Sequence, residues 1–294
     1  MLKLENIGIT FNPGTSDENI ALKNINLEIQ KGDFITVIGS NGAGKSTLYN
    51  VISGTLQPSC GHIFLNSQEI TKQPEYKRAA YIGRIFQNPL LGTAGKMSLA
   101  DNMMICSKKG WKGLKISLTK KKKEEFREKL KQLNMGLEER LNDNVEQFSG
   151  GQRQALTLLM TVLSNPEILL LDEHTAALDP TNAAIVMELT KKFAQENNLT
   201  VMMVTHNMQQ ALDYGNRLLM MDGGEIIMDI KDSEKQKLTL QDLADRFKQS
   251  VCLLPIVRFF FFVVIGKSKP FNKFITSFLI IFKFCALLSF LTLQ

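Results

Sequence analysis

The stretch "FITVIGSNGAGKSTLYNVISG", Phe34 to Gly54, decides the fold. Its opening residues, Phe34–Ile38, form an apolar, β-branched run of the kind that buried strands use. At its other end, Leu48 and Val51 fall on one helical face, and Gly54 can end that helix. The segment between them follows the pattern glycine, four residues, Gly-Lys-Ser. Strand, glycine-rich loop and helix in this order predict an α/β fold with a phosphate-binding loop.

The glycines of this loop let backbone amides close around phosphate oxygens where side chains would obstruct them. Lys45 is then expected to reach the β and γ phosphates, and the Ser46 hydroxyl to ligate Mg²⁺. A structural glycine turn with an incidental lysine is the alternative, which the full pattern and its context disfavour. The predicted nucleotide-binding residues here are Gly39, Ser40, Asn41, Gly42, Ala43, Gly44, Lys45, Ser46 and Thr47.

Two further apolar runs end in polar side chains. The run at Ile168–Leu171 has the continuous apolar character of a central parallel strand and is followed by Asp172 and Glu173. Since open α/β sheets bind ligands at the carboxyl ends of their strands, Asp172 is placed to hold the metal through water. Glu173 is the candidate to orient or deprotonate the attacking water. His206, at the end of "VMMVTHN", is expected to contact the γ-phosphate and hold Glu173 and the water in line. An exposed acidic turn and a surface histidine are the plainer alternatives.

A second anion cradle follows a hundred residues after the first. "VEQFSGGQRQA", Val145 to Ala155, places two glycines after a serine at the start of an expected helix, which presents bare amides to an anion. One chain with one phosphate loop does not need both.

The order of motifs resembles the ATP-binding subunit of an ABC (ATP-binding cassette) transporter, over about residues 1 to 250. The resemblance is carried by the phosphate loop, Gln87 after "YIGRIF", "FSGGQ", "LLLDE", "AALD" and His206. It implies a P-loop NTPase cassette with a RecA-like parallel core, an antiparallel β subdomain and a helical subdomain. It also implies that two cassettes, a homodimer or a pair with a related cassette, sandwich two ATP molecules head to tail. The second cradle then binds the γ-phosphate held by the partner.

The same resemblance assigns roles to single residues. Ser149 and the amide of Gly151 are expected to contact the partner's γ-phosphate, with Gln152 supporting their loop, and Asp179 to couple the two sites across the dimer. The implied catalytic residues are Glu173, His206 and Gln87, and the implied metal ligands are Ser46, Gln87 and Asp172. Phe11, Ser149, Gly150, Gly151, Gln152 and Asp179 join the phosphate loop as nucleotide-binding residues. The implied cofactors are ATP and Mg²⁺.

Several of these positions invite a second interpretation. Phe11 lies where the family places an aromatic ring against adenine, but a lone phenylalanine in an N-terminal strand is often core. Phe148 replaces the usual leucine, an apolar exchange. His174 stands where most cassettes have proline, and a structural role is expected for it rather than catalysis. "DEHTAALDP" and "LGTAGKMSLADN" resemble bacterial importers paired with periplasmic or lipoprotein binding proteins, some linked to tryptophan or related small molecules.

The distribution of charge and the spacing of the cysteines limit the classes of partner and of bound metal that the chain can have. The net charge is +6, but five basic residues and no acid lie in 251–294, which leaves 30 basic against 29 acidic residues elsewhere. This near-neutral body argues against nucleic acid as a partner. Four scattered cysteines show neither metal spacing nor a disulfide framework, and "MLKLENIGIT" is not a signal peptide. We expect a peripheral protein at the cytoplasmic face of the membrane, docked on permease subunits and linked through them to a substrate-binding protein.

The remaining body is expected to supply the subdomains. Strands are predicted at 2–11, 21–29 and 62–65, a helical insertion at about 96–150 and a closing hairpin at "RLLMMDGGEII". In "TKKKKEEFREKLKQL", Glu124 and Glu128 stand four residues before Glu128 and Gln132 rather than before lysines, so this helix is interpreted as mainly a solvated face. Attraction of the basic segment 108–123 to anionic lipid is the functional alternative.

Residues 251–294 break from this pattern. Ten of the 18 phenylalanines fall there, acids vanish, and no cassette motif remains to be supplied. A shifted reading frame near the end of an A/T-rich gene is the leading interpretation. A membrane anchor is the second, although Lys283 interrupts the longer apolar run at a cost of roughly 3 kcal/mol. A folded extension packed on the body is the third.

The same phosphate-binding motifs also occur in proteins with functions other than transport. A soluble cassette ATPase, such as an iron–sulfur assembly component, is the main alternative because its size is similar. Translation-type members usually carry two cassettes, and repair-type members insert long coiled coils that this chain lacks. A GTP-binding switch would need an Asn-Lys-x-Asp element, which is absent from the sequence.

Overall fold

A computed structural model describes residues 1–107 and 118–247. Residues 1–247 belong to one compact unit, and the interpretations of 251–294 and of most of the basic segment 108–123 lie outside the described residues. Among the described helices, none has both the length and the apolar character needed to cross a bilayer.

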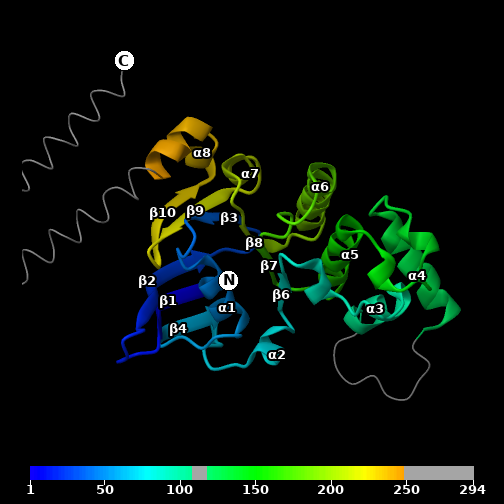
Figure 1. Cartoon of the computed structure of the whole chain (residues 1–294), viewed down its shortest axis with the longest axis horizontal. Coiled ribbons are helices and arrows are strands. Elements are labelled where there is room, and N and C mark those ends of the chain that lie inside the picture. The colour runs from blue at the N-terminus through cyan, green and yellow to red at the C-terminus, as the bar shows by residue number, and fades with distance from the viewer. Residues whose placement is uncertain (108–117, 248–294) are drawn as a thin grey trace, which may run out of the picture. The chain divides into compact units, whose positions relative to one another are not determined.

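A six-stranded, mainly parallel sheet forms the centre of this unit, in the order β10-β9-β3-β8-β7-β6 (Figure 1). Its strands are β3 (Phe34–Gly39), β6 (Ile82–Ile85), β7 (Ile168–Asp172), β8 (Thr200–Val204), β9 (Arg217–Asp222) and β10 (Glu225–Lys231). Only β10 runs antiparallel, in the expected hairpin with β9. Val204 of β8 is in register with both Val37 of β3 and Asp172 of β7. The loops that follow these three strands therefore leave the sheet at one edge.

Alternation along the strands buries both faces of this sheet. Leu169 and Leu171 of β7 lie in one core with the helices α5 (Gly150–Leu163) and α6 (Pro180–Glu196). Ile168 and Leu170 lie in a second core, with the helix α1 (Lys45–Ser53). Because successive side chains of a strand point to opposite faces, the continuous apolar run of β7 serves both cores.

The second core is closed by an antiparallel sheet in the order β2-β1-β4-β5. Its strands are β1 (Leu2–Phe11), β2 (Asn19–Ile29), β4 (Cys60–Leu65) and β5 (Gln68–Glu69). This layer confirms the predicted strands, with β2 and β4 each starting two residues earlier than expected.

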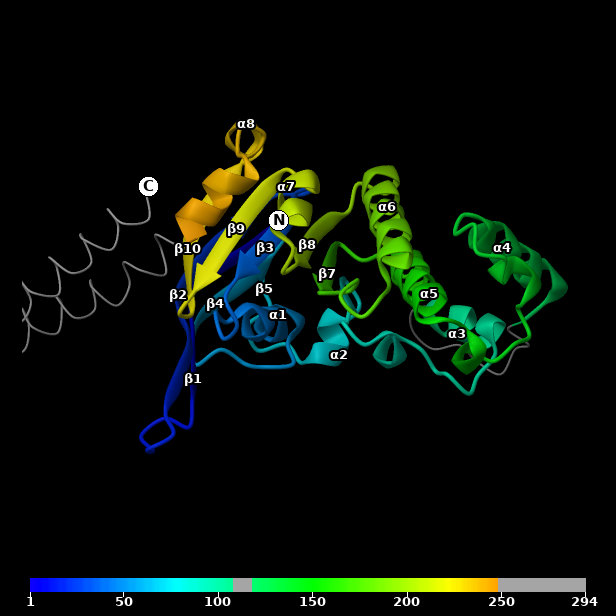
Figure 2. The same ribbon diagram turned by 45° about the horizontal axis from the view of Figure 1, so that its top comes forward.

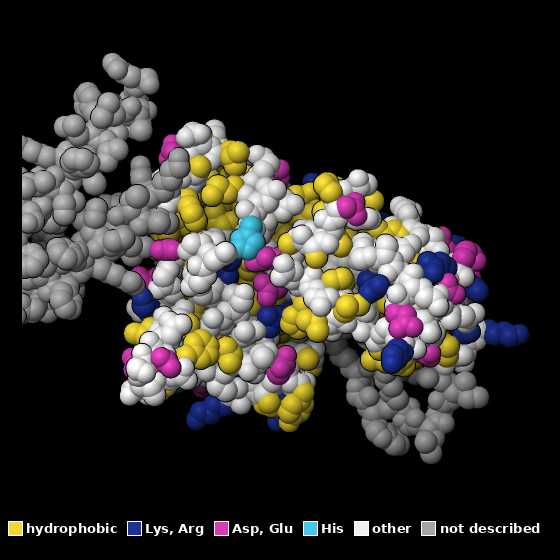
Figure 3. Space-filling view, viewed as in Figure 1, with side chains coloured by type: hydrophobic (Ala, Val, Ile, Leu, Met, Phe, Trp, Pro, Cys, Tyr) yellow, Lys and Arg dark blue, Asp and Glu magenta, His cyan; other side chains and the backbone are white. Residues whose placement is uncertain are grey.

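The predicted helical insertion is also present. It contains α3 (Leu99–Cys106) and α4 (Lys120–Lys131), which gather with α5 away from β1, β2 and β4 (Figures 1 and 2). The interpretation of α4 as a solvated face was incomplete. Phe126 and Leu130 are fully buried, and the glutamates pair with basic residues three positions away rather than four: Lys122–Glu125, Arg127–Glu124 and Lys131–Glu128. Figure 3 shows basic and acidic side chains interspersed over this part of the surface.

Short helices complete the unit. They are α2 (Glu75–Arg78), α7 (Met208–Asp213), α8 (Asp232–Lys235) and the 3₁₀ helices Pro89–Gly92, Leu137–Glu139 and Val145–Gln147. A third core, which includes Ala211 of α7 and Leu218 of β9, covers the outer end of the large sheet.

Candidate functional site

The phosphate loop joins β3 to α1 and is packed tightly on its surroundings. A Cβ on Gly39 would lie 2.2 Å from the Met221 carbonyl oxygen. One on Gly44, at φ +95°, would lie 2.7 Å from the Ala21 carbonyl oxygen. Glycine is therefore required at both positions, by close approach at the first and by backbone conformation at the second. The Ser40 hydroxyl donates to Asp222 Oδ1 at 2.7 Å, which ties the loop to the end of β9.

Lys45 lies inside this loop and is 6% exposed. Its ammonium donates to the carbonyl oxygens of Gly39 (2.8 Å) and Ser40 (2.9 Å). Burial lowers the pKa of Lys45, while the nearby carboxylates of Glu173 and Asp172 act in the opposite direction. The cation and both predicted carboxylates thus share one electrostatic environment, although they come from distant parts of the chain.

Asp172 ends β7 beside Arg84, a basic side chain that is not among the predicted site residues. Its Oδ2 accepts a hydrogen bond from Arg84 of β6 at 3.1 Å, and both side chains are mostly buried. Arg84 also donates to Asn50 Oδ1 of α1 at 2.6 Å. The signal for Arg84 was visible in "YIGRIF", where a cation interrupts an apolar strand.

Glu173 adopts an uncommon backbone conformation, with φ +49°. For a residue other than glycine, this left-handed region costs on the order of 1–3 kcal/mol, and it persists where the surroundings impose it. The Glu173 amide donates to the Val204 carbonyl at 3.2 Å. Its carboxylate oxygen Oε1 lies 2.5 Å from Nε2 of His206. Figure 3 shows a histidine beside acidic side chains near the middle of the face in view. The predicted pairing of Glu173 with His206 is therefore present in the geometry.

His174, the residue after Glu173, is buried against α6. It is 2% exposed, and its Nε2 is 3.2 Å from the Thr190 hydroxyl of α6. The hydroxyl donates its own proton to the Val186 carbonyl, so His174 is the donor to Thr190. Burial lowers the pKa of His174 to about 4. A neutral, buried histidine agrees with the structural role expected for it.

The second cradle forms the start of α5. Ser149 caps this helix, because its hydroxyl accepts from the Gln152 amide (3.2 Å) and the Gln152 side chain accepts from the Ser149 amide (3.1 Å). The side-chain nitrogen Nε2 of Gln152 also donates to the Met135 carbonyl. A Cβ on Gly151 would lie 2.6 Å from the side chain of Asn182. Asn182 in turn is bound by Asp179, the capping residue of α6.

The two cradles do not meet within this chain. In residues 1–107 and 118–247, no hydrogen bond or ion pair joins Ser149–Gln152 to the phosphate loop. Ser149 and Gly150 are exposed, as are Gln87 after β6 and the loop residues Asn41, Gly42 and Ser46. Phe11 ends β1 with 37% of its surface exposed, so it is accessible rather than part of the core.

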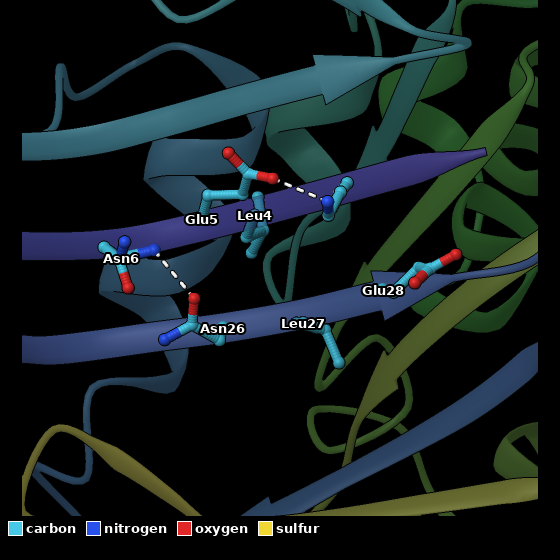
Figure 4. Close-up of a pocket in the computed structure, with 7 residues that line it drawn as sticks. Leu4, Glu5, Asn6, Asn26, Leu27 and Glu28 are labelled. Atoms are coloured by element: carbon cyan, nitrogen blue, oxygen red, sulfur yellow. Dashed lines mark hydrogen bonds and ion pairs between the residues drawn. The ribbon is translucent and has the colours of Figure 1, made fainter.

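The donors in the crevice fit a nucleotide with a hard divalent cation. Ser46 offers a hydroxyl and Asp172 a carboxylate, the oxygen ligands that Mg²⁺ prefers. A surface hollow elsewhere offers nothing comparable. It lies over β1 and β2, where Lys3 pairs with Glu5 and the Asn6 amide donates to Asn26 (Figure 4). The residues predicted to bind the phosphates and the metal thus lie where β3, β7 and β8 end, at one edge of the large sheet.

Comparisons with known proteins identify the family of the chain. Residues 22–176 match the profile of the ABC transporter family. The chain is 42% identical over 255 residues to the tyrosine transport ATP-binding protein of Clostridioides difficile, covering 85% of this chain and all of that protein. It is 31% identical to a phosphonates import ATP-binding protein of Lactococcus lactis, covering 83% of this chain and 98% of that protein.

The solved structures lead to the same family. A dimeric ATP-binding cassette in a post-hydrolysis state, bound to ADP and Pi, superposes with a TM-score of 0.66 at 29% identity, covering 79% of this chain and 98% of that one. The chain therefore belongs to the ABC transporter family and is an ATP-binding subunit that hydrolyses ATP.

Proposed function

We propose that this chain energises a solute importer by Mg²⁺-dependent ATP hydrolysis at the interface of a head-to-tail dimer. One observation carries the proposal. The carboxylates of Asp172 and Glu173 act electrostatically on Lys45, and Glu173 contacts His206, whereas Ser149 and Gly150 are exposed at the start of α5. Each chain would thus bind one ATP at its phosphate loop and offer Ser149 and Gly150 to the ATP of another chain. Two copies related by a twofold axis would complete two sites.

Different residues of the proposed site would bind the phosphates, hold the metal and activate the attacking water. With the triphosphate in the loop, Lys45 would exchange its two carbonyl contacts for phosphate oxygens. Ser46 and Asp172 would hold Mg²⁺, with Gln87 near it, and the metal would neutralise charge on the phosphates. Glu173 would hold the attacking water and accept its proton, and His206 would keep that carboxylate in place. Ser149 and the Gly151 amide would contact the partner's γ-phosphate, and Asp179 would couple the two sites.

The partners follow from the family and its relatives. ABC transporter subunits act with membrane permeases, and several similar proteins are import subunits. We infer that this chain docks on the cytoplasmic side of a permease served by a substrate-binding protein. The similarity to a tyrosine transport protein favours tyrosine or a related aromatic amino acid as the solute. Exposed apolar side chains after Gln87, Leu90 and Leu91, suit the permease contact.

Glu173→Gln tests the catalytic assignment, because it keeps the shape of the side chain while removing the base. Hydrolysis is expected to fall by about 10²–10⁴-fold with ATP binding retained. The ATP-bound protein should then accumulate as a dimer in light scattering after gel filtration. Glu196→Gln, on the exposed side of α6, is the matched control and should hydrolyse ATP normally. Steady-state hydrolysis within about threefold of wild type in Glu173→Gln would remove Glu173 from this role.

Transport itself needs a separate test. Cells lacking this subunit should lose ATP-dependent uptake of labelled tyrosine and regain it with the wild-type chain but not with Lys45→Ala. Uptake of tyrosine that is unchanged by the deletion would exclude this solute while leaving the ATPase assignment intact.

A further inference from the structure

Arg84 is a mostly buried cation with three kinds of contact. It donates to Asp172 at 3.1 Å and to Asn50 at 2.6 Å, and its guanidinium carbon lies 4.7 Å from the centre of the Phe86 ring. Its Nε is buried without a partner in the described structure. Burying a guanidinium with an unmet donor is costly, so its place in the apolar strand β6 calls for an explanation.

The pairing with Asp172 supplies part of that explanation. A mostly buried carboxylate needs a positive charge nearby, and Arg84 supplies one to Oδ2. The metal proposed for this crevice would use the same carboxylate. Two cations on one carboxylate repel each other, so arrival of the metal weakens the hold of Arg84 on Asp172. Asn50 and the Phe86 ring give the guanidinium other contacts to keep when this happens.

Phe86 connects this pair to the second cradle. Its carbonyl accepts a hydrogen bond from Gln154 Nε2 at 3.3 Å. Gln154 is fully buried, its Oε1 has no partner in the described structure, and it lies in the second turn of α5. Contacts therefore run from Asp172 through Arg84, Phe86 and Gln154 to the helix that Ser149 caps.

We propose that Arg84 is a positioning residue whose contact with Asp172 weakens when the metal binds that carboxylate. The resulting shift of Arg84 then moves Phe86, Gln154 and the start of α5. Binding of ATP and metal at the chain's own phosphate loop thereby positions Ser149 and Gly151 to contact the ATP of the other chain in the dimer. The inference rests on the proposed function, because it takes Asp172 as a metal ligand and Ser149 as a contact to the partner's ATP.

The first test measures how binding of a fluorescent ATP analogue depends on Mg²⁺ concentration. Arg84→Gln removes the competing charge, so the half-saturating Mg²⁺ concentration is expected to fall about three- to tenfold. Arg84→Lys keeps the charge and should stay near wild type. Arg140→Gln is the matched control, since Arg140 also pairs with an aspartate and stacks on a phenylalanine but does not contact Asp172. An unchanged or higher value in Arg84→Gln would overturn the proposal.

The second test measures ATP-dependent dimerisation in the Glu173→Gln background. Gln154→Leu removes the hydrogen bond to Phe86 but leaves the Arg84–Asp172 pair, so it should weaken the dimer at least about threefold without moving the Mg²⁺ dependence. Thr161→Val on the same helix is the control, because the Thr161 hydroxyl donates to the Thr157 carbonyl within α5 rather than to Phe86. The double variant Arg84→Gln/Gln154→Leu should be no weaker than the poorer single variant. Additive losses would refute the connection.

A wild-type chain that binds the analogue without any need for Mg²⁺ would contradict the proposed function and the inference with it. If binding of the analogue needs Mg²⁺ but the half-saturating Mg²⁺ concentration is unchanged in Arg84→Gln, only the inference is contradicted.

Discussion

Acid should destabilise this protein through His174, and the size of the effect follows from its burial. The pKa of His174 falls from 6.5 to about 4 on folding. The unfolded chain therefore binds the proton first as pH drops, so the stability contributed by neutral His174 is complete above pH 6.5 and is lost towards pH 4. Proton linkage gives a loss of about 0.2 kcal/mol at pH 7 and about 2 kcal/mol at pH 5.

His174→Gln separates this residue from other acid-sensitive groups. Glutamine retains an N–H donor for Thr190 but does not titrate. Urea unfolding at pH 7 and pH 5 measures the free energy of unfolding of both proteins. Between the two pH values wild type should lose about 2 kcal/mol more than His174→Gln, with all other titrating groups common to both. A difference below about 0.5 kcal/mol would show that the pKa of His174 is not lowered by folding, which would contradict this account.

Three further predictions concern the dimer and the end of the chain. Ser149→Arg should bind ATP but not hydrolyse it, and mixing it with Lys45→Ala should restore one composite site of two; a mixture with no more ATPase activity than either parent would argue against the head-to-tail dimer. Gly151→Ala should lower the free energy of unfolding by about 1–3 kcal/mol and weaken dimerisation, because the added methyl group would clash with Asn182. A free energy of unfolding in urea equal to that of wild type would contradict this. Truncation after Ser250 should give a more soluble protein with equal ATP affinity and hydrolysis, whereas loss of folding or ATP binding would show that the tail is needed.

Much of the fold could be predicted because its signals are local. The phosphate loop carries its own strand and helix, so Phe34 to Gly54 needed no distant information. The meeting of Asp172, Glu173 and His206 near Lys45 was predicted from topology, since parallel strands of one sheet end at one edge. The two-residue shifts at β2 and β4 are the ordinary uncertainty of element boundaries.

The remaining features depend on contacts between distant segments. Nothing near Arg84 in the sequence indicates that Asn50 and Asp172 would lie on either side of its guanidinium. The positive φ of Glu173 likewise accompanies a distant contact, the hydrogen bond from its amide to the Val204 carbonyl of β8. Charge pairs three residues apart on α4 escaped a search at spacing four, although both spacings bring side chains together on a helix.

These distant contacts explain why the crevice needs a second chain. Asp172 is held by Arg84 and Glu173 by His206, so both carboxylates are already positioned by residues of their own subunit. Ser149, by contrast, is fixed only within its own helix turn and faces solvent. In the proposed site, Lys45 already supplies one donor to the γ-phosphate, and the second cradle of another chain would add more. Electrostatic stabilisation of the charge on the γ-phosphate is usually the largest catalytic term. Hydrolysis by a lone chain should therefore be slow at any ATP concentration, and activity should rise with the square of protein concentration below the dimer dissociation constant. A rate strictly proportional to protein concentration across that range, with the protein monomeric by light scattering, would contradict this account of the site.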